Sequence, residues 1–163
     1  MRRFPVSAVL VSMFFVLMLC GSRAYGQISS LKGISGVNVV VNLDDDGKAL
    51  GLTEETVQTD AELKLRLAGL RILSDTERLA ARGGPFLYVN IMVVRYFGRN
   101  AAAYQVEFCQ NVTLERNGQF FAGATTWDEL GLEVNPTAES IRSGIKHHVD
   151  SFLNAWLSVN PKK

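Results

Sequence analysis

The chain has few of the residues that build cross-links, metal sites and catalytic centres. It has two cysteines, Cys20 and Cys109, and two histidines, His147 and His148. A metal centre needs three or four ligands, and no Cys or His cluster is available to supply them. The set of nucleophile, base and oxyanion donors that defines a hydrolytic site cannot be assembled either. The sequence therefore predicts a non-enzymatic protein with no cofactor.

The first 26 residues have the layout of a secretory signal peptide. Arg2 and Arg3 precede an apolar run over residues 6–19, and Ala24-Tyr25-Gly26 offers small residues before a cleavage between Gly26 and Gln27. The run is shorter than the ~20 residues that a membrane-spanning helix needs. We expect an exported protein, periplasmic or secreted.

The same segment has a second interpretation, as the leader of a lipoprotein. Leu17-Met18-Leu19-Cys20-Gly21 resembles a bacterial lipobox, in which Cys20 would carry the lipid. Leu19 stands where that pattern prefers a small residue, so lipidation is the disfavoured alternative. Contact with a membrane is expected only if Cys20 is lipidated.

Cleavage after Gly26 would change the charge of the chain. Residues 1–26 contain three arginines and no acid, so the 17 basic residues become 14 against 16 acidic ones. A net charge of −2 argues against nucleic acid as a partner, because domains that bind it are usually basic. Only Cys109 would remain, which excludes a disulfide within the mature chain.

The residue pattern predicts a short leader over residues 27–36 and one α/β domain over residues 37–160. Alternating valines from Val37 to Leu43 predict a strand, which Asp44-Asp45-Asp46-Gly47 ends as a turn. Thr53 is expected to cap a helix that stops at Gly69. A short strand over 70–73 and a short helix from Ser74 to Ala81 follow.

The second half predicts a meander and a long helix. We expect strands over 86–96, 104–115 and 119–127, with a hairpin turn at Asn117-Gly118. Asn135 and Pro136 are expected to open a last helix that ends at Asn160-Pro161. The order β-α-β-(α)-β-β-β-α, with both long helices on one face of a mixed sheet, defines a two-layer α/β (α+β) sandwich.

Three segments carry a resemblance. Gly51-Leu52-Thr53-Glu54-Glu55 with Pro85-Phe86-Leu87-Tyr88-Val89-Asn90, and the closing Val149-Asp150-Ser151-Phe152-Leu153-Asn154-Ala155, are similar to an uncharacterised group of small exported bacterial proteins. The element order also resembles, in topology only, the envelope domains of CsgG, LpoB and the N-terminal part of TolB. The second resemblance implies a role in binding other proteins.

Three residues are candidates for chemistry. His147 and Asp150 share a helix face and form a weak candidate for a metal pair, whereas His148 is expected at the core boundary. Cys109 is expected on the polar face of its strand. It is interpreted as a tolerated small residue, with an intermolecular disulfide as the second choice.

The apolar residues of the meander exceed what one helix layer can cover. On the strand over 86–96 both faces are apolar, and Phe121 and Trp127 add to the excess. Either residues 128–135 fold across the second face, or that face binds a partner or a second copy. The predicted binding residues are Phe86, Tyr88, Met92, Tyr96, Phe121 and Trp127.

These observations predict an exported envelope accessory protein that binds another protein, an unknown envelope protein or itself, through its sheet. The alternative is a periplasmic carrier of a small molecule or lipid, which would need a cavity between the sheet and the helices.

Overall fold

A computed structural model describes residues 27–161, and the predicted signal peptide, its cleavage at Gly26 and Cys20 lie outside this range. The elements in chain order are β1 (Gly36–Leu43), α2 (Asp45–Ala49), α3 (Glu54–Ala68), β2 (Arg71–Ile72), α4 (Asp75–Ala80), β3 (Phe86–Tyr96), β4 (Arg99–Thr113), β5 (Phe120–Val134) and α5 (Ala138–Val159). No helix in the described range is long and apolar enough to cross a membrane.

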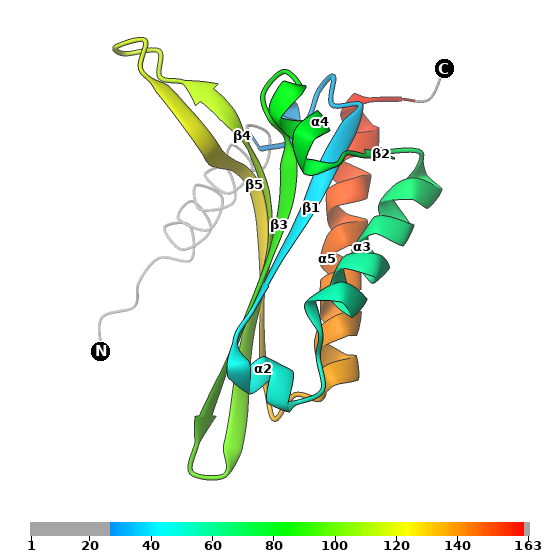
Figure 1. Ribbon diagram of the computed structural model, residues 1–163, viewed down its shortest axis with the longest axis vertical. Helices are drawn as coiled ribbons and strands as arrows, with labels where there is room; N and C mark the ends of the chain where they lie inside the picture. The colour runs from blue at the N-terminus through cyan, green and yellow to red at the C-terminus, as the bar shows by residue number, and fades with distance from the viewer. Residues whose placement is uncertain (1–26, 162–163) are drawn as a thin grey trace, which may run out of the picture.

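The fold is the predicted two-layer α/β sandwich. Five strands form one mixed sheet in the order β2-β1-β3-β4-β5, in which β1 is parallel to both neighbours and β3, β4 and β5 form an antiparallel meander. The long helices α3 and α5 lie side by side over one face of this sheet (Figure 1). We call the face under these helices the inner face and the opposite face the outer face.

The side chains between the two layers fill the space there. Phe108 of β4 stacks on Phe152 of α5, with ring centroids 5.6 Å apart. Trp127 of β5 meets Phe152 edge to face at 5.3 Å. Phe108 and Phe152 are completely buried, as are Val37, Leu65, Leu87 and Ile141. A carrier of small molecules would need a cavity in this layer, and the three rings fill the part of it between β4, β5 and α5.

The two long helices begin at side-chain caps. Thr53 accepts a hydrogen bond from Thr56 N, and Gly69 ends α3 in the left-handed conformation, both as predicted. The prediction for α5 was wrong by two residues. Thr137 is the cap and forms a reciprocal pair with Ser140, whereas Asn135 has a φ of +53° and belongs to the connection from β5.

The acidic run after β1 is more structured than the predicted turn. Asp44 caps the short helix α2 by accepting a hydrogen bond from Gly47 N at 2.8 Å. Its other carboxylate oxygen accepts from Val93 N at 2.7 Å. Asp44 thereby fixes the end of β1 against β3, because both of its oxygens bind backbone donors.

The predicted leader, residues 27–36, packs against the end of α5. Leu31 is completely buried in the core. Trp156 of α5 donates its indole N–H to the Ile34 carbonyl at 2.8 Å, and Asn160 Nδ2 donates to the Leu31 carbonyl at 2.9 Å. The end of α5 therefore holds this segment in place.

Residues 128–135 do not fold across the outer face. Residues 120–134 form one continuous strand, β5, which lies at the edge of the sheet and pairs with β4 along its length. Register shifts at Phe108/Cys109 and Gln110/Val112 mark bulges in the β4–β5 pair. This arrangement leaves the lower outer face of β3, β4 and β5 without a covering helix in the described range (Figure 1).

Candidate interaction surface

A patch of apolar side chains occupies the outer face near the β3–β4 hairpin. Its composition follows from the strand register. Met92 pairs with Ala103, which pairs with Leu132, and Val94 pairs with Ala101, which pairs with Val134. Leu130 lies one step further along β5, opposite Gln105. We call this set the outer patch: Met92, Val94, Ala101, Ala103, Leu130, Leu132 and Val134.

The large side chains of the outer patch are well exposed. Leu132 and Val134 expose 76% and 72% of their surface, and Met92, Val94 and Leu130 expose 53–56%. Single exposed apolar residues are ordinary in folded proteins, whereas a contiguous apolar patch marks an interaction site. The three strands of the outer patch make it contiguous.

Charged residues lie at both ends of the outer patch. Glu107 and Asp128 face each other across the β4–β5 pair, beyond Leu130. Arg99 is exposed at the opposite end, where β4 leaves the hairpin. An apolar centre with a charged rim is the usual composition of a protein–protein interface.

The structure separates the predicted binding residues. Met92 belongs to the outer patch. Phe86 and Tyr88 lie further up the outer face and are half-buried, with the Arg78 guanidinium of α4 5.0 Å from the centre of the Phe86 ring. The side chain of Tyr96 lies outside the described part of the structure.

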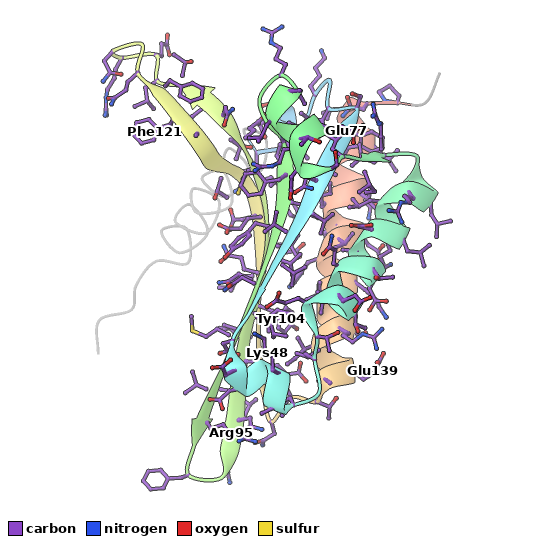
Figure 2. All side chains as sticks on the ribbon, in the orientation of Figure 1. Lys48, Glu77, Arg95, Tyr104, Phe121 and Glu139 are labelled. Atoms are coloured by element: carbon purple, nitrogen blue, oxygen red, sulfur yellow. The ribbon has the colours of Figure 1, made fainter. Side chains whose placement is uncertain are left out.

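The other two predicted residues are elsewhere. Phe121 is 48% exposed on the β4–β5 hairpin, at the opposite end of the molecule from Arg95 (Figure 2). Trp127 is only 6% exposed and lies on the inner face against Phe152, so the structure does not place it on the predicted surface. Two register shifts of β5 on β4 lie between Trp127 and Phe121, so the two residues do not follow one alternation.

Six members of the outer patch are not among the predicted binding residues: Val94, Ala101, Ala103, Leu130, Leu132 and Val134. A signal for three of them was present in the sequence. Leu130, Leu132 and Val134 alternate with Glu129, Gly131 and Glu133, which is the period of a strand with one apolar face.

The candidate metal pair is engaged in a different contact. Lys64 of α3 donates to both carboxylate oxygens of Asp150, at 2.6 and 2.7 Å. This ion pair joins the two long helices. Within residues 27–161 no group of three or more His, Cys, Asp and Glu side chains is arranged to hold a metal ion.

Cys109 is buried rather than placed at the surface. The residue is 4% exposed, and its Sγ lies 3.7 Å from Thr125 Oγ1. Burial raises the pKa of the Cys109 thiol, the Thr125 hydroxyl acts in the opposite direction, and the charge of Glu107 adds to the rise. A protonated, buried thiol is a poor nucleophile, and an intermolecular disulfide would require the strand pair to open.

Tyr104 and His148 form a polar cluster inside the sandwich. Their ring centroids are 5.4 Å apart, and His148 Nδ1 lies 3.4 Å from Glu129 Oε1. His148 is 7% exposed, and neither ring nitrogen has a well-formed hydrogen bond. Burial raises the pKa of the Tyr104 phenol, and the charge of Glu133 adds to this rise.

Backbone of β5 and of α5 lies close to two sides of the Tyr104 ring. A methyl group added at Gly131 would lie 2.2 Å from Tyr104 Cε2, and one added at Gly144 would lie 2.3 Å from the phenol oxygen. The two glycines thus allow β5 and α5 to approach the two sides of this ring. The Tyr104 ring therefore packs between β5 and α5 where both backbones carry glycine.

No family model and no curated protein matches the sequence. Among solved structures, the chain is similar to a single-residue variant of the PelC dodecamer from Paraburkholderia phytofirmans, with a TM-score of 0.43, 17% identity and coverage of 77% of this chain and 90% of that chain. It is also similar to a PelC dodecamer from the same organism in another crystal form, with a TM-score of 0.35, 20% identity and coverage of 77% and 87%. Both TM-scores are below 0.5, so the function proposed for this chain rests on its own residues.

Proposed function

We propose that this chain is an exported, non-enzymatic accessory protein of the cell envelope that binds another protein through the outer patch. The observation that carries the proposal is the strand register, which aligns apolar residues of β3, β4 and β5 on a face that no described helix covers. The signal-peptide pattern of residues 1–26 supports export.

Burial of the outer patch would supply enough free energy for a moderate affinity. Fully burying one Val, Leu or Met side chain contributes about 1.5–3 kcal/mol. Five such side chains of the outer patch still expose half or more of their surface. Their burial would contribute on the order of 5 kcal/mol, to which rim contacts add, against the entropic cost of association.

The charges favour a second copy of this chain as the partner. Glu107 and Asp128 lie at one end of the outer patch and Arg99 at the other. When two copies meet face to face with antiparallel strands, each Arg99 approaches the partner's acidic end. Such an isologous contact is the commonest arrangement in protein dimers.

The test compares a double serine substitution in the outer patch with a single serine substitution on α3. Met92→Ser with Leu132→Ser removes the centre of the outer patch, and Leu67→Ser on α3 is the control, because Leu67 is as exposed as Leu132. Sedimentation velocity of the protein expressed from its full gene measures the assembly. We expect the double variant to dissociate and the control to match the wild type.

A wild-type protein that is monomeric at every concentration would contradict self-association through this face. An assembly that survives the double substitution would contradict the outer patch as its interface.

A further inference from the structure

The opposite edge of the sheet has a second binding feature, independent of the outer patch. Strand β2 is only two residues long and pairs with β1 at Gly36 and Val37 alone. β1 continues to Leu43, so most of its outer edge has no neighbouring strand in the described range (Figure 1).

The backbone groups on this edge are identified by the hydrogen bonds of their neighbours. The Val37 carbonyl accepts from Leu73 N at 2.9 Å on the β2 side, whereas Asn38 N donates to the Pro85 carbonyl on the β3 side. Because successive residues of a strand point in alternate directions, the N–H and C=O groups of Val39 and Val41 point toward the open edge. No hydrogen bond joins them to another described residue.

A groove of about 660 Å³ runs along this edge. Its floor is β1 from Asn38 to Val41, one wall is α3 with Glu62 and Arg66, and the other is the start of α4 with Asp75. A strand edge that lies open between two walls offers the geometry for β-strand addition, in which an extended peptide continues the sheet. Native proteins usually protect such an edge with proline, charge or a bulge, and Val39 to Val41 have none of these.

Asn38 joins the floor of the groove to the end of β2. Its side chain is more than nine-tenths buried and lines the groove, and its Nδ2 donates to the Leu73 carbonyl at 2.8 Å. Its Oδ1 has no hydrogen-bond partner. A buried polar atom without a partner is costly, and this oxygen is enclosed by the protein.

The charged side chains of the groove walls favour one sign of charge on the bound peptide. Glu62 accepts from Gln58 and Arg66, and Glu77 accepts from Ser74 N and Arg71, so these carboxylates have partners within the chain. Asp75 has no such partner among the described residues. Acidic groups outnumber basic ones along the groove, which favours a basic segment over an acidic one.

We propose that this groove binds an extended segment of another polypeptide, which adds to β1 as a strand in line with β2 and carries a basic side chain beside Asp75. The backbone of Val39 and Val41 supplies two donors and two acceptors for this strand.

The test uses two synthetic peptides, Lys-Val-Thr-Val-Lys-Val and Glu-Val-Thr-Val-Glu-Val, titrated against the full chain to millimolar concentration. Amide hydrogen exchange and backbone NMR shifts are the measurements. We expect the basic peptide to slow exchange at Val39 and Val41 and to bind more tightly than the acidic one. A basic peptide that is N-methylated at alternate residues should not bind, because it lacks the donors.

Three variants locate the contact. Val41→Pro removes an edge N–H without removing a β1–β3 hydrogen bond, and Val41→Ala is its control because it keeps that N–H. We expect Val41→Pro to weaken the basic peptide about fivefold to tenfold relative to Val41→Ala, the effect of one hydrogen bond. Asp75→Lys, on the exposed start of α4, should reverse the preference between the two peptides. This variant tests the binding site in the groove if Val41→Pro does not fold.

Unchanged exchange at Val39 and Val41 with both peptides at millimolar concentration would overturn the proposal. Binding that shifts the amides of Met92 and Leu132 instead would also overturn it, because the peptide would then occupy the outer patch. Neither result bears on self-association, which sedimentation measures separately.

Discussion

Met92 on β3 and Leu132 on β5 are both paired with Ala103 of β4, so two large apolar side chains flank one small side chain on the outer face. This relationship is repeated one step further along the strands, where Val94 and Val134 flank Ala101. Side chains directly opposite each other on neighbouring strands are in contact range. The outer patch is therefore one surface and not a set of scattered residues.

The packing of α5 on the sheet depends on the glycine beside Tyr104. We expect Gly144→Ala to destabilise the protein by about 1–3 kcal/mol, because its methyl group would overlap the Tyr104 ring. In an ordinary helix the same substitution stabilises by about 1 kcal/mol. Urea unfolding of the single variants and of the double variant with Tyr104→Ala measures the coupling.

The sign of the Gly144→Ala effect should reverse in the Tyr104→Ala background. Ser143→Ala, at the exposed neighbouring position, serves as the control and should change stability by less than about 0.5 kcal/mol. An equal loss from Gly144→Ala in both backgrounds would show that Tyr104 is not the cause.

Two aromatic residues that the sequence assigned to one surface should differ sharply in their effect on stability. We expect Trp127→Ala to cost about 3–5 kcal/mol, because Trp127 packs on Phe152 in the core. Phe121→Ala should cost less than about 0.5 kcal/mol, since Phe121 is half exposed on a hairpin. Chemical denaturation of both variants is the measurement, and similar costs would contradict the assignment of Trp127 to the inner face.

The raised pKa of the Cys109 thiol predicts a loss of stability at alkaline pH. The folded protein holds the thiol proton more tightly than the unfolded chain does, since burial disfavours the thiolate. The free energy of unfolding should therefore fall as the pH rises above about 8.5, the ordinary thiol pKa, toward the raised value. Denaturation at a series of pH values from about 7.5 to 9.5 measures it.

Cys109→Ala removes this titration, so its stability should depend less on pH over the same range. A wild-type protein and a Cys109→Ala variant with parallel pH profiles would contradict a raised thiol pKa.

The Lys64–Asp150 ion pair predicts no response to zinc at the His147–Asp150 pair. Adding Zn²⁺ should leave the melting temperature unchanged, because both Asp150 oxygens already accept from Lys64 Nζ. Asp150→Asn should cost no more than about 1 kcal/mol, as expected for a partly exposed pair. A rise in melting temperature with Zn²⁺ that His147→Ala abolishes would establish the metal site.

The sequence was sufficient to predict the sandwich because the segments that form the core have a clear apolar periodicity. Alternating valines define β1, and Thr53 and Gly69 bound α3 through local hydrogen bonds. The placement of Phe121 relative to Trp127 could not be predicted in the same way, because two bulges in the β4–β5 pair lie between these residues. A bulge is a property of two paired strands, and the pattern of one strand does not contain it.

The two proposed binding surfaces differ in how far the sequence predicts them. The excess apolar face of β3 is visible from residues 86–96, although its partners on β5 require the strand pairing. The open edge of β1 cannot be predicted from the sequence. It follows from the shortness of β2 and from the position of α4, both of which are tertiary features.

The most direct test of the outer patch as a protein-binding surface is site-specific photo-crosslinking in cells. A benzophenone side chain is placed at Leu132 on the outer patch or at Leu67 on α3, two positions that are 76% and 75% exposed. We expect one adduct of defined mass from position 132, either a dimer of this chain or a complex with one envelope protein, and none from position 67. No adduct at position 132, or the same adducts from both positions, would contradict the account.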